Sequence, residues 1–192
     1  MVAAPERART QAIEAMLREA GMRSRTVERS ACAPELLRTD HVVLLDWPEE
    51  QAPGATMPLG ELERWDRPTV FLGRGGEHFA RVWGLPSPAE LAELTDLGPE
   101  IERIEPAAGA SAVVWRQGHL LYFEAHSSPA EFDEAERRWL AQILAYGSRF
   151  VIDRPIVRHP TATGAPLPER ECLRRVRIDE AARALGVRVH ER

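Results

Sequence analysis

The sequence contains no lysine and no asparagine, so all 25 of its basic residues are arginine. Without lysine the chain can neither form a Schiff base with a carbonyl substrate nor build a Walker-type phosphate-binding loop, because both need that residue. Exclusive use of arginine is typical of the codon bias of a GC-rich genome. The two cysteines, Cys32 and Cys172, lie far apart, so we expect neither a disulfide framework nor a structural zinc site.

Long apolar runs are also missing. No stretch approaches the roughly 20 residues that cross a bilayer, and the first ten residues have no basic or apolar region of a signal peptide. We therefore expect a cytoplasmic protein with no membrane partner. The net charge is −5 and no basic face is concentrated before the last forty residues, so nucleic acid is not an expected partner either.

The composition is that of a globular protein, with 44% hydrophobic and 29% charged residues. A chain of 192 residues suits one domain and a tail, which we place at 1–150 and 151–192. The tail begins with a proline-rich segment that is typical of an extended surface stretch or linker. It ends in a predicted short helix from about Asp179 to Leu185, whose sequence "IDEAARALGV" favours docking on the domain edge over the start of a helix-turn-helix.

Helical and strand patterns alternate through the first half of the chain. Helices are predicted over 5–20, 33–40 and 58–66, and strands over 23–30, 41–46 and 69–73. This alternation indicates an α/β fold, a parallel sheet with helices on both faces. Only residues 1–5 precede the first helix, so we expect the first strand of such a fold to be stunted or trimmed.

The second half adds a hairpin and the strongest helix. "SAVVWRQGHLLYFEA" predicts two strands around a turn that contains Gly118. The helix that follows should begin at Ser128 or Pro129 and end at Gly147.

Three loops that follow predicted strands should share one rim, at the carboxyl ends where open parallel sheets bind ligands. They begin after Asp46, after "TVFL" and after "HLLYFEA". His126 and Glu124 are the candidate catalytic residues. The candidate ligand-binding residues are Asp46, Gly73, Arg74, Gly75, Gly76, Glu77, His78 and Ser127.

His126 has two interpretations, a loop-bonding or capping residue and an acid/base or ligand contact. Ser127 and Ser128 are expected to cap the following helix rather than to act as nucleophiles. The carboxylates and histidines of the rim are acceptable metal ligands, but they lack HxH or HxxxH spacing. We therefore predict no metal site and no cofactor.

The segment "FLGRGGEHF" places glycines directly after a strand, where backbone N–H groups can approach a ligand. Its spacing is not that of a dinucleotide-binding GxGxxG motif. The order of strand, tight turn and helix also fits a nucleophile elbow, but Arg74 and Gly75 stand where such an elbow needs serine or cysteine. Covalent catalysis from this loop is not expected.

The stretch "SAVVWRQGHLLYFEAHSSPAEFDEAERRWLAQILAYG" resembles the end of ThuA-like (trehalose utilisation) domains, within the class I glutamine amidotransferase-like superfamily. "DHVVLLDWP" and "RPTVFLGRGGEH" fit the same core, and the resemblance covers roughly residues 6–150. Ala125 replaces the glycine that precedes the family's histidine. The matching residues are Trp115, Gly118, Tyr122, Phe123, His126 and the helix to Tyr146.

The resemblance implies a flavodoxin-like three-layer fold and a link to sugar metabolism. Amidotransferase activity is not implied, because the elbow cysteine is missing. Two hypotheses follow: a domain that binds a small polar molecule such as a sugar at the rim, with or without turnover, and a non-catalytic module that contacts a protein partner or a second copy of the chain. A third, a DNA-linked regulator, rests only on "IDEAARALGV".

Overall fold

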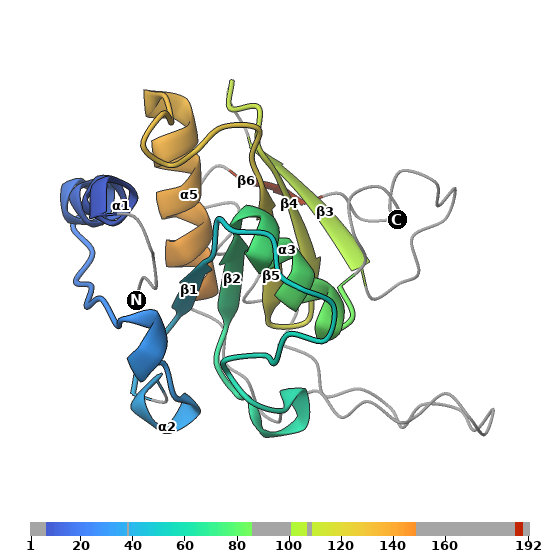
Figure 1. Cartoon of the computed structure of the whole chain (residues 1–192). Helices are drawn as coiled ribbons and strands as arrows, with labels where there is room; N and C mark the ends of the chain where they lie inside the picture. The colour runs from blue at the N-terminus through green and yellow to red at the C-terminus, as the bar shows by residue number, and fades with distance from the viewer. Residues whose placement is uncertain (1–6, 38, 86–100, 107–108, 149–186, 190–192) are drawn as a thin grey trace.

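The computed structural model describes residues 7–37, 39–85, 101–106, 109–148 and 187–189 (Figure 1). The predicted tail lies outside these residues except for 187–189. The elements are, in chain order, α1 (Arg7–Glu19), η1 (Arg29–Ala31), α2 (Pro34–Leu37), β1 (Val43–Asp46), η2 (Leu62–Arg64), β2 (Thr69–Leu72), α3 (Gly73–Val82), β3 (Ile101–Pro106), β4 (Val113–Gln117), β5 (Leu120–Glu124), α5 (Glu134–Gly147) and β6 (Val187–Val189).

The chain has an α/β fold built on one mixed sheet with the strand order β1-β2-β5-β4-β3-β6. β1, β2 and β5 are parallel, whereas β4, β3 and β6 continue the sheet in antiparallel fashion. The alternation of helices and strands had predicted a parallel sheet, and the structure shows that only part of the sheet is parallel. The reason is the predicted hairpin: β4 and β5 are joined by a two-residue turn, in which Gly118 has a φ of 57°.

Helices cover both faces of the sheet, because successive strand residues point to opposite sides. Leu44 of β1 packs with the buried faces of α1 and α5, whereas its neighbours Val43 and Leu45 pack with α3. Figure 1 shows α3 in front of the strands and α1 beside α5. All four residues of β1 and of β2 are buried, which explains their uninterrupted apolar sequence.

Three elements differ from the sequence prediction. Instead of a helix over 58–66, the structure has only the 3-10 turn η2 (Leu62–Arg64). The stretch 23–30 is not a strand: only Thr26 forms an isolated bridge, and only Val27 of this stretch is buried in the core. α5 begins at Glu134 rather than at Ser128 or Pro129, because the side chain of Asp133 accepts a 2.8 Å hydrogen bond from Glu136 N–H and caps the helix. The predicted end at Gly147 is confirmed.

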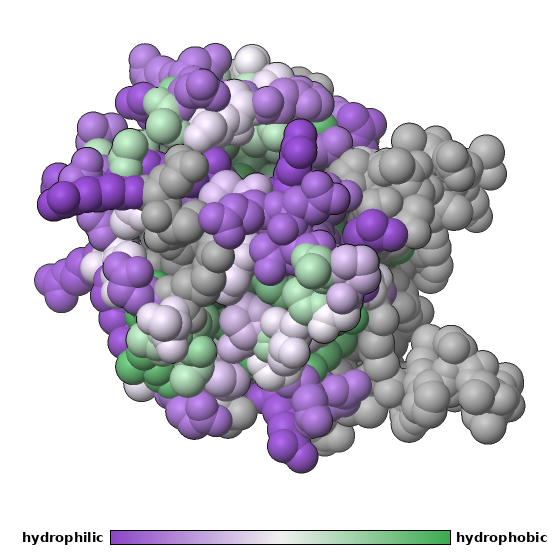
Figure 2. Space-filling view, viewed as in Figure 1, coloured by the Kyte–Doolittle hydropathy of each residue, from purple (hydrophilic) through white to green (hydrophobic). Residues whose placement is uncertain are grey.

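Hydrophilic residues predominate on the face of the molecule seen in Figure 2. Figure 2 shows apolar residues in small separate groups on the face seen in Figure 1. The large hydrophobic side chains exposed among the described residues are Leu36 and Val82. Within the same part of the chain, no helix is long and apolar enough to cross a membrane.

A histidine that the sequence analysis did not single out is buried in the β4–β5 turn. His119 is 2% exposed, and its Nε2 has no hydrogen-bond partner among the described residues. Burial lowers the pKa of His119 to about 4, although Asp66 and a hydrogen bond to the backbone of Trp65 act in the opposite direction. The folded protein therefore holds this imidazole in its neutral form at pH 5 to 7.

His119 should make the folded state less stable as the pH falls. Because its folded pKa of about 4 lies below the ordinary 6.5, the unfolded chain takes up more protons between these values. We expect its contribution to the free energy of unfolding to fall by about 2 kcal/mol from pH 7.5 to pH 5. Urea unfolding at both values should show a flatter pH dependence for His119→Gln. His126→Gln, which replaces an exposed histidine, is the matched control for the loss of an imidazole. Equal slopes in all three proteins would contradict the assignment.

Candidate functional site

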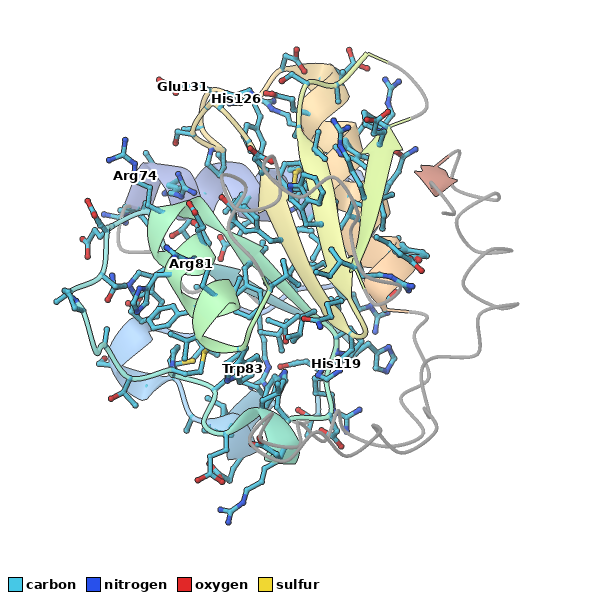
Figure 3. All side chains as sticks on the ribbon, turned by 90° about the vertical axis from the view of Figure 1, so that its right-hand side faces the viewer. Arg74, Arg81, Trp83, His119, His126 and Glu131 are labelled. Carbon is cyan, nitrogen blue, oxygen red and sulfur yellow. The ribbon has the colours of Figure 1, made fainter. Side chains whose placement is uncertain are left out.

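The carboxyl ends of β1, β2 and β5 lie side by side in register, with Asp46 opposite Leu72 and Leu72 opposite Phe123. The three loops that follow these strands therefore meet at one rim. They enclose a hollow of about 480 Å³. In Figure 3, His126 and Arg74 mark this end of the sheet, opposite to His119 and Trp83.

The hollow is lined mainly by polar side chains from α1, α3, β5 and the loop after β5. The polar residues that line it are Arg9, Arg74, Glu77, Tyr122, Glu124, His126, Ser127 and Ser128. The remaining lining residues are Pro48, Leu72, Gly73, Phe123 and Ala125. Six of the candidate residues therefore line it, namely Gly73, Arg74, Glu77, Glu124, His126 and Ser127. Asp46, Gly75, Gly76 and His78 do not.

Asp46 is fully buried beneath the rim, where it holds α1 rather than facing the hollow. Its two carboxylate oxygens accept hydrogen bonds of 2.6 Å each from Nε and Nη2 of Arg9. Nη1 of Arg9 donates to Ser128 Oγ at 3.1 Å. This bidentate ion pair fixes the orientation of both side chains and joins the N-terminal helix to the loop that carries His126.

The N-terminus of α3 is occupied by the chain itself. The N–H groups of Gly75 and Gly76 donate to the carbonyl oxygen of Trp47, at 2.8 and 3.2 Å. A Cβ on Gly75 would lie 2.5 Å from the Glu49 carbonyl oxygen, and one on Gly73 would lie 2.7 Å from that of Trp47. The glycines thus let the loop after β1 pack against the helix. The sequence had predicted that these N–H groups face a ligand, whereas they bind the chain's own carbonyl oxygen.

His78 does not line the hollow; its ring packs against that of the next residue, Phe79. The two rings are 5.5 Å apart and meet edge to face. Its Nε2 is buried and has no hydrogen-bond partner among the described residues.

The loop that carries His126 is anchored by the two serines that follow this residue. Ser127 Oγ donates to Glu136 Oε2 at 3.2 Å, and Ser111 Oγ donates to Oε1 of the same buried carboxylate at 2.8 Å. Ser128 accepts from Arg9. Neither serine caps α5, contrary to expectation: the N-cap is Asp133, while Ser127 binds the side chain of Glu136 within α5 and Ser128 binds Arg9 of α1. His126 itself is exposed.

Tyr122 and Glu124 form the wall that β5 contributes to the hollow. Glu124 Oε2 accepts a 2.7 Å hydrogen bond from the indole Nε1 of Trp115 on the neighbouring strand. Burial raises the pKa of Tyr122, and the carboxylates of Glu77 and Glu124 raise it further. Tyr122 is therefore a neutral hydrogen-bonding group and not a phenolate base.

Within the described part of the chain, His126 makes no hydrogen bond to Glu124 or Asp46, whose carboxylates bind Trp115 and Arg9. No group of three or more potential metal ligands occurs there either. The arrangement can recognise a polar molecule through several hydrogen bonds.

The sequence analysis missed two polar residues of the hollow, Arg9 and Tyr122, and expected Ser128 to cap a helix rather than to line it. Tyr122 could have been found from the alternation of β5, since Tyr122 and Glu124 are two residues apart and share a face. Arg9 gave no such signal, because its position depends on where α1 docks.

Comparison of the chain with protein-family models, with curated proteins and with solved structures gave no match.

Gly75→Ala should destabilise the protein by about 1–3 kcal/mol, because the new methyl group would overlap the loop after β1. Gly76→Ala is the matched control one residue along: its Cβ would meet its nearest atom, Phe71 C, at 3.4 Å. Since alanine favours a helix by up to about 1 kcal/mol over glycine, Gly76→Ala should be neutral or stabilising. Urea unfolding measures both, and equal losses would show that the close approach is not what demands glycine.

Asp46→Ala should lower the free energy of unfolding by about 3–5 kcal/mol, because it leaves the Arg9 guanidinium buried without its counter-ion. Asp40→Ala breaks the Arg25–Asp40 pair, whose side chains are 40% and 19% exposed, and should lower it by less than about 1 kcal/mol. Chemical unfolding at low and high salt distinguishes the two. A small loss in Asp46→Ala would show that Arg9 finds another partner or water.

Proposed function

We propose that the chain binds a small polar ligand, of which a sugar or related polyol is the leading candidate, in the hollow at the carboxyl rim of the sheet. The observation that carries this proposal is the hollow itself, where hydrogen-bonding side chains of three neighbouring segments converge. Mixed polar and apolar concave sites of this volume are typical of small-molecule binding.

We also propose that the chain is a ThuA-like domain with a flavodoxin-like three-layer core, and that it is located in the cytoplasm. Its support is the resemblance in the β4–β5–α5 region together with the position of His126 at the hollow. We propose binding without covalent catalysis, because Gly75 is buried under Trp47 and offers no nucleophile, and because His126 has no carboxylate partner among the described residues.

The alternative, a module that acts only by contacting a protein partner or a second copy of the chain, has less support. Such a module would present an apolar patch, whereas the exposed large hydrophobic side chains of the described residues are the single residues Leu36 and Val82.

A thermal-shift screen of glucose, trehalose, glucuronate and magnesium chloride tests the proposal. A ligand at ten times its Kd should raise the free energy of unfolding by about 1.4 kcal/mol, or the midpoint by roughly 3–6 °C. We expect this shift to shrink or vanish in His126→Ala and Tyr122→Phe.

His41→Ala is the control, because His41 is also exposed but does not line the hollow. The proposal is wrong if no compound shifts the midpoint, or if the shift is the same in all variants.

A further inference from the structure

Trp115 is a buried residue of β4 that binds a group of the hollow without lining the hollow itself. It is 8% exposed, and its indole Nε1 donates a 2.7 Å hydrogen bond to Oε2 of Glu124, which does line the hollow. Tyr122 lies directly opposite Trp115 on β5, so Glu124 is the diagonal neighbour of Trp115 on the same face of the sheet. Because the acceptor is a carboxylate oxygen, the bond belongs to the short and strong charge-assisted class.

The indole ring of Trp115 has little freedom to turn. Its strand, β4, is an inner strand with β3 on one side and β5 on the other. The residue opposite it on β3 is Arg103, whose guanidinium carbon lies 5.6 Å from the centroid of the indole ring. The residue opposite it on β5 is Tyr122, which is also buried. A tryptophan side chain has only two torsions, so packing between these neighbours defines where its N–H group lies.

Glu124 depends on this hydrogen bond for its orientation. The residue is half-buried, and Trp115 is its hydrogen-bond partner among the described residues. A glutamate side chain has several torsions and loses much conformational entropy when it is held in one rotamer. Without the indole N–H group, the described part of the chain offers no other hydrogen bond that would hold the carboxylate in one place.

The bond to Trp115 leaves acceptor capacity on the carboxylate. An ionised carboxylate accepts hydrogen bonds through both of its oxygens, and the indole occupies Oε2 of Glu124. A binding group that is already held in one orientation does not pay the cost of ordering when a ligand arrives, so it contributes more to affinity. The hydrogen bond from outside the hollow therefore prepares an acceptor that lies within its lining.

We propose that Trp115 is a positioning residue of the rim hollow: its indole N–H group holds Glu124 in one orientation, in which the carboxylate accepts a hydrogen bond from a hydroxyl of the ligand. This inference rests on the proposed function, since it specifies how one acceptor of the same hollow is prepared. Trp115 acts through Glu124 and makes no contact with the ligand itself.

The hydrogen bond is tested first without a ligand, by nuclear magnetic resonance of the full chain labelled with nitrogen-15. The indole N–H signal that disappears in Trp115→Phe belongs to Trp115. Glu124→Gln replaces the charged acceptor by a neutral one, so this signal should move upfield. Glu63→Gln, which changes an exposed glutamate outside the lining of the hollow, should leave it in place. A signal that stays in place in Glu124→Gln would overturn the proposal.

The positioning is measured next, as the mobility of the Glu124 side chain from carbon-13 relaxation of its methylene groups. Trp115→Phe keeps an aromatic ring but removes the N–H group, so Glu124 should become more mobile. Trp83→Phe is the matched control and should leave Glu124 unchanged. Trp83 is also buried, its Nε1 donates to the Gly60 carbonyl oxygen at 3.3 Å, and Figure 3 shows it at the opposite end of the sheet from His126.

The melting midpoint shows that each variant is folded. If Trp115→Phe does not fold, 3-benzothienylalanine at position 115 replaces it, because this analogue has the shape of tryptophan with sulfur in place of the N–H group. Equal mobility of Glu124 with and without the indole N–H group would overturn the proposal, since the bond would then only satisfy the buried indole.

Binding is measured last, by titration calorimetry with glucose, trehalose and glucuronate. Whichever of these binds should bind about two- to tenfold more weakly to Trp115→Phe, the loss expected when one side chain must be ordered on binding. The double variant Trp115→Phe/Glu124→Gln should bind as Glu124→Gln does, because Trp115 acts only through Glu124. Additive losses would overturn the proposal. If none of the three compounds binds, the proposed function fails, while the two measurements without a ligand still decide whether Trp115 positions Glu124.

Discussion

The ion pair between Arg9 and Asp46 is the interaction on which the rim depends. Arg9 comes from the first helix and Asp46 from the end of β1, and the same guanidinium reaches Ser128 in the loop after β5, 119 residues away in sequence. A guanidinium has five donors in a fixed planar arrangement, so each additional partner is placed relative to the others. Its burial means that neither charge can be left alone without a large penalty.

A second buried carboxylate completes the framework. Glu136, in the first turn of α5, accepts hydrogen bonds from Ser127 and Ser111 and so ties the same loop to the helix behind it. His126 stands exposed on a backbone that is fixed on its carboxyl side by two adjacent serines. The hollow is therefore bounded on one side by the strand β5 and on another by the helix α3.

Much of this fold could be predicted from the sequence. The uninterrupted apolar runs of β1 and β2 predicted buried parallel strands, and the turn at Gly118 predicted the hairpin. The stretch 23–30 could not be assigned correctly, because alternation of side chains says nothing about whether a neighbouring strand is available. The start of α5 was placed too early, because Ser128 and Asp133 are both acceptable caps and only the tertiary contacts of Ser128 decide between them.

The site was less predictable than the fold, for a physical reason. A carboxylate at the end of a strand has the same local sequence whether it faces a ligand or a buried arginine, and the arginine that pairs with Asp46 lies 37 residues away. Likewise, the glycines after β2 predicted a close approach of backbone, and the structure has one, but the approaching group is the chain's own loop. The shared rim of the three loops was predictable because it follows from strand direction alone.

The carbonyl oxygen of Trp47 accepts hydrogen bonds from two N–H groups in the first turn of α3. In phosphate-binding proteins, a phosphate oxygen commonly occupies this position at the N-terminus of a helix. The helix terminus is thus already supplied with a partial negative charge from within. An engineer who wished to give this scaffold a nucleotide site would gain nothing by adding basic side chains around the glycines. The loop after β1 would first have to be shortened or redirected, so that the two donors are released to solvent.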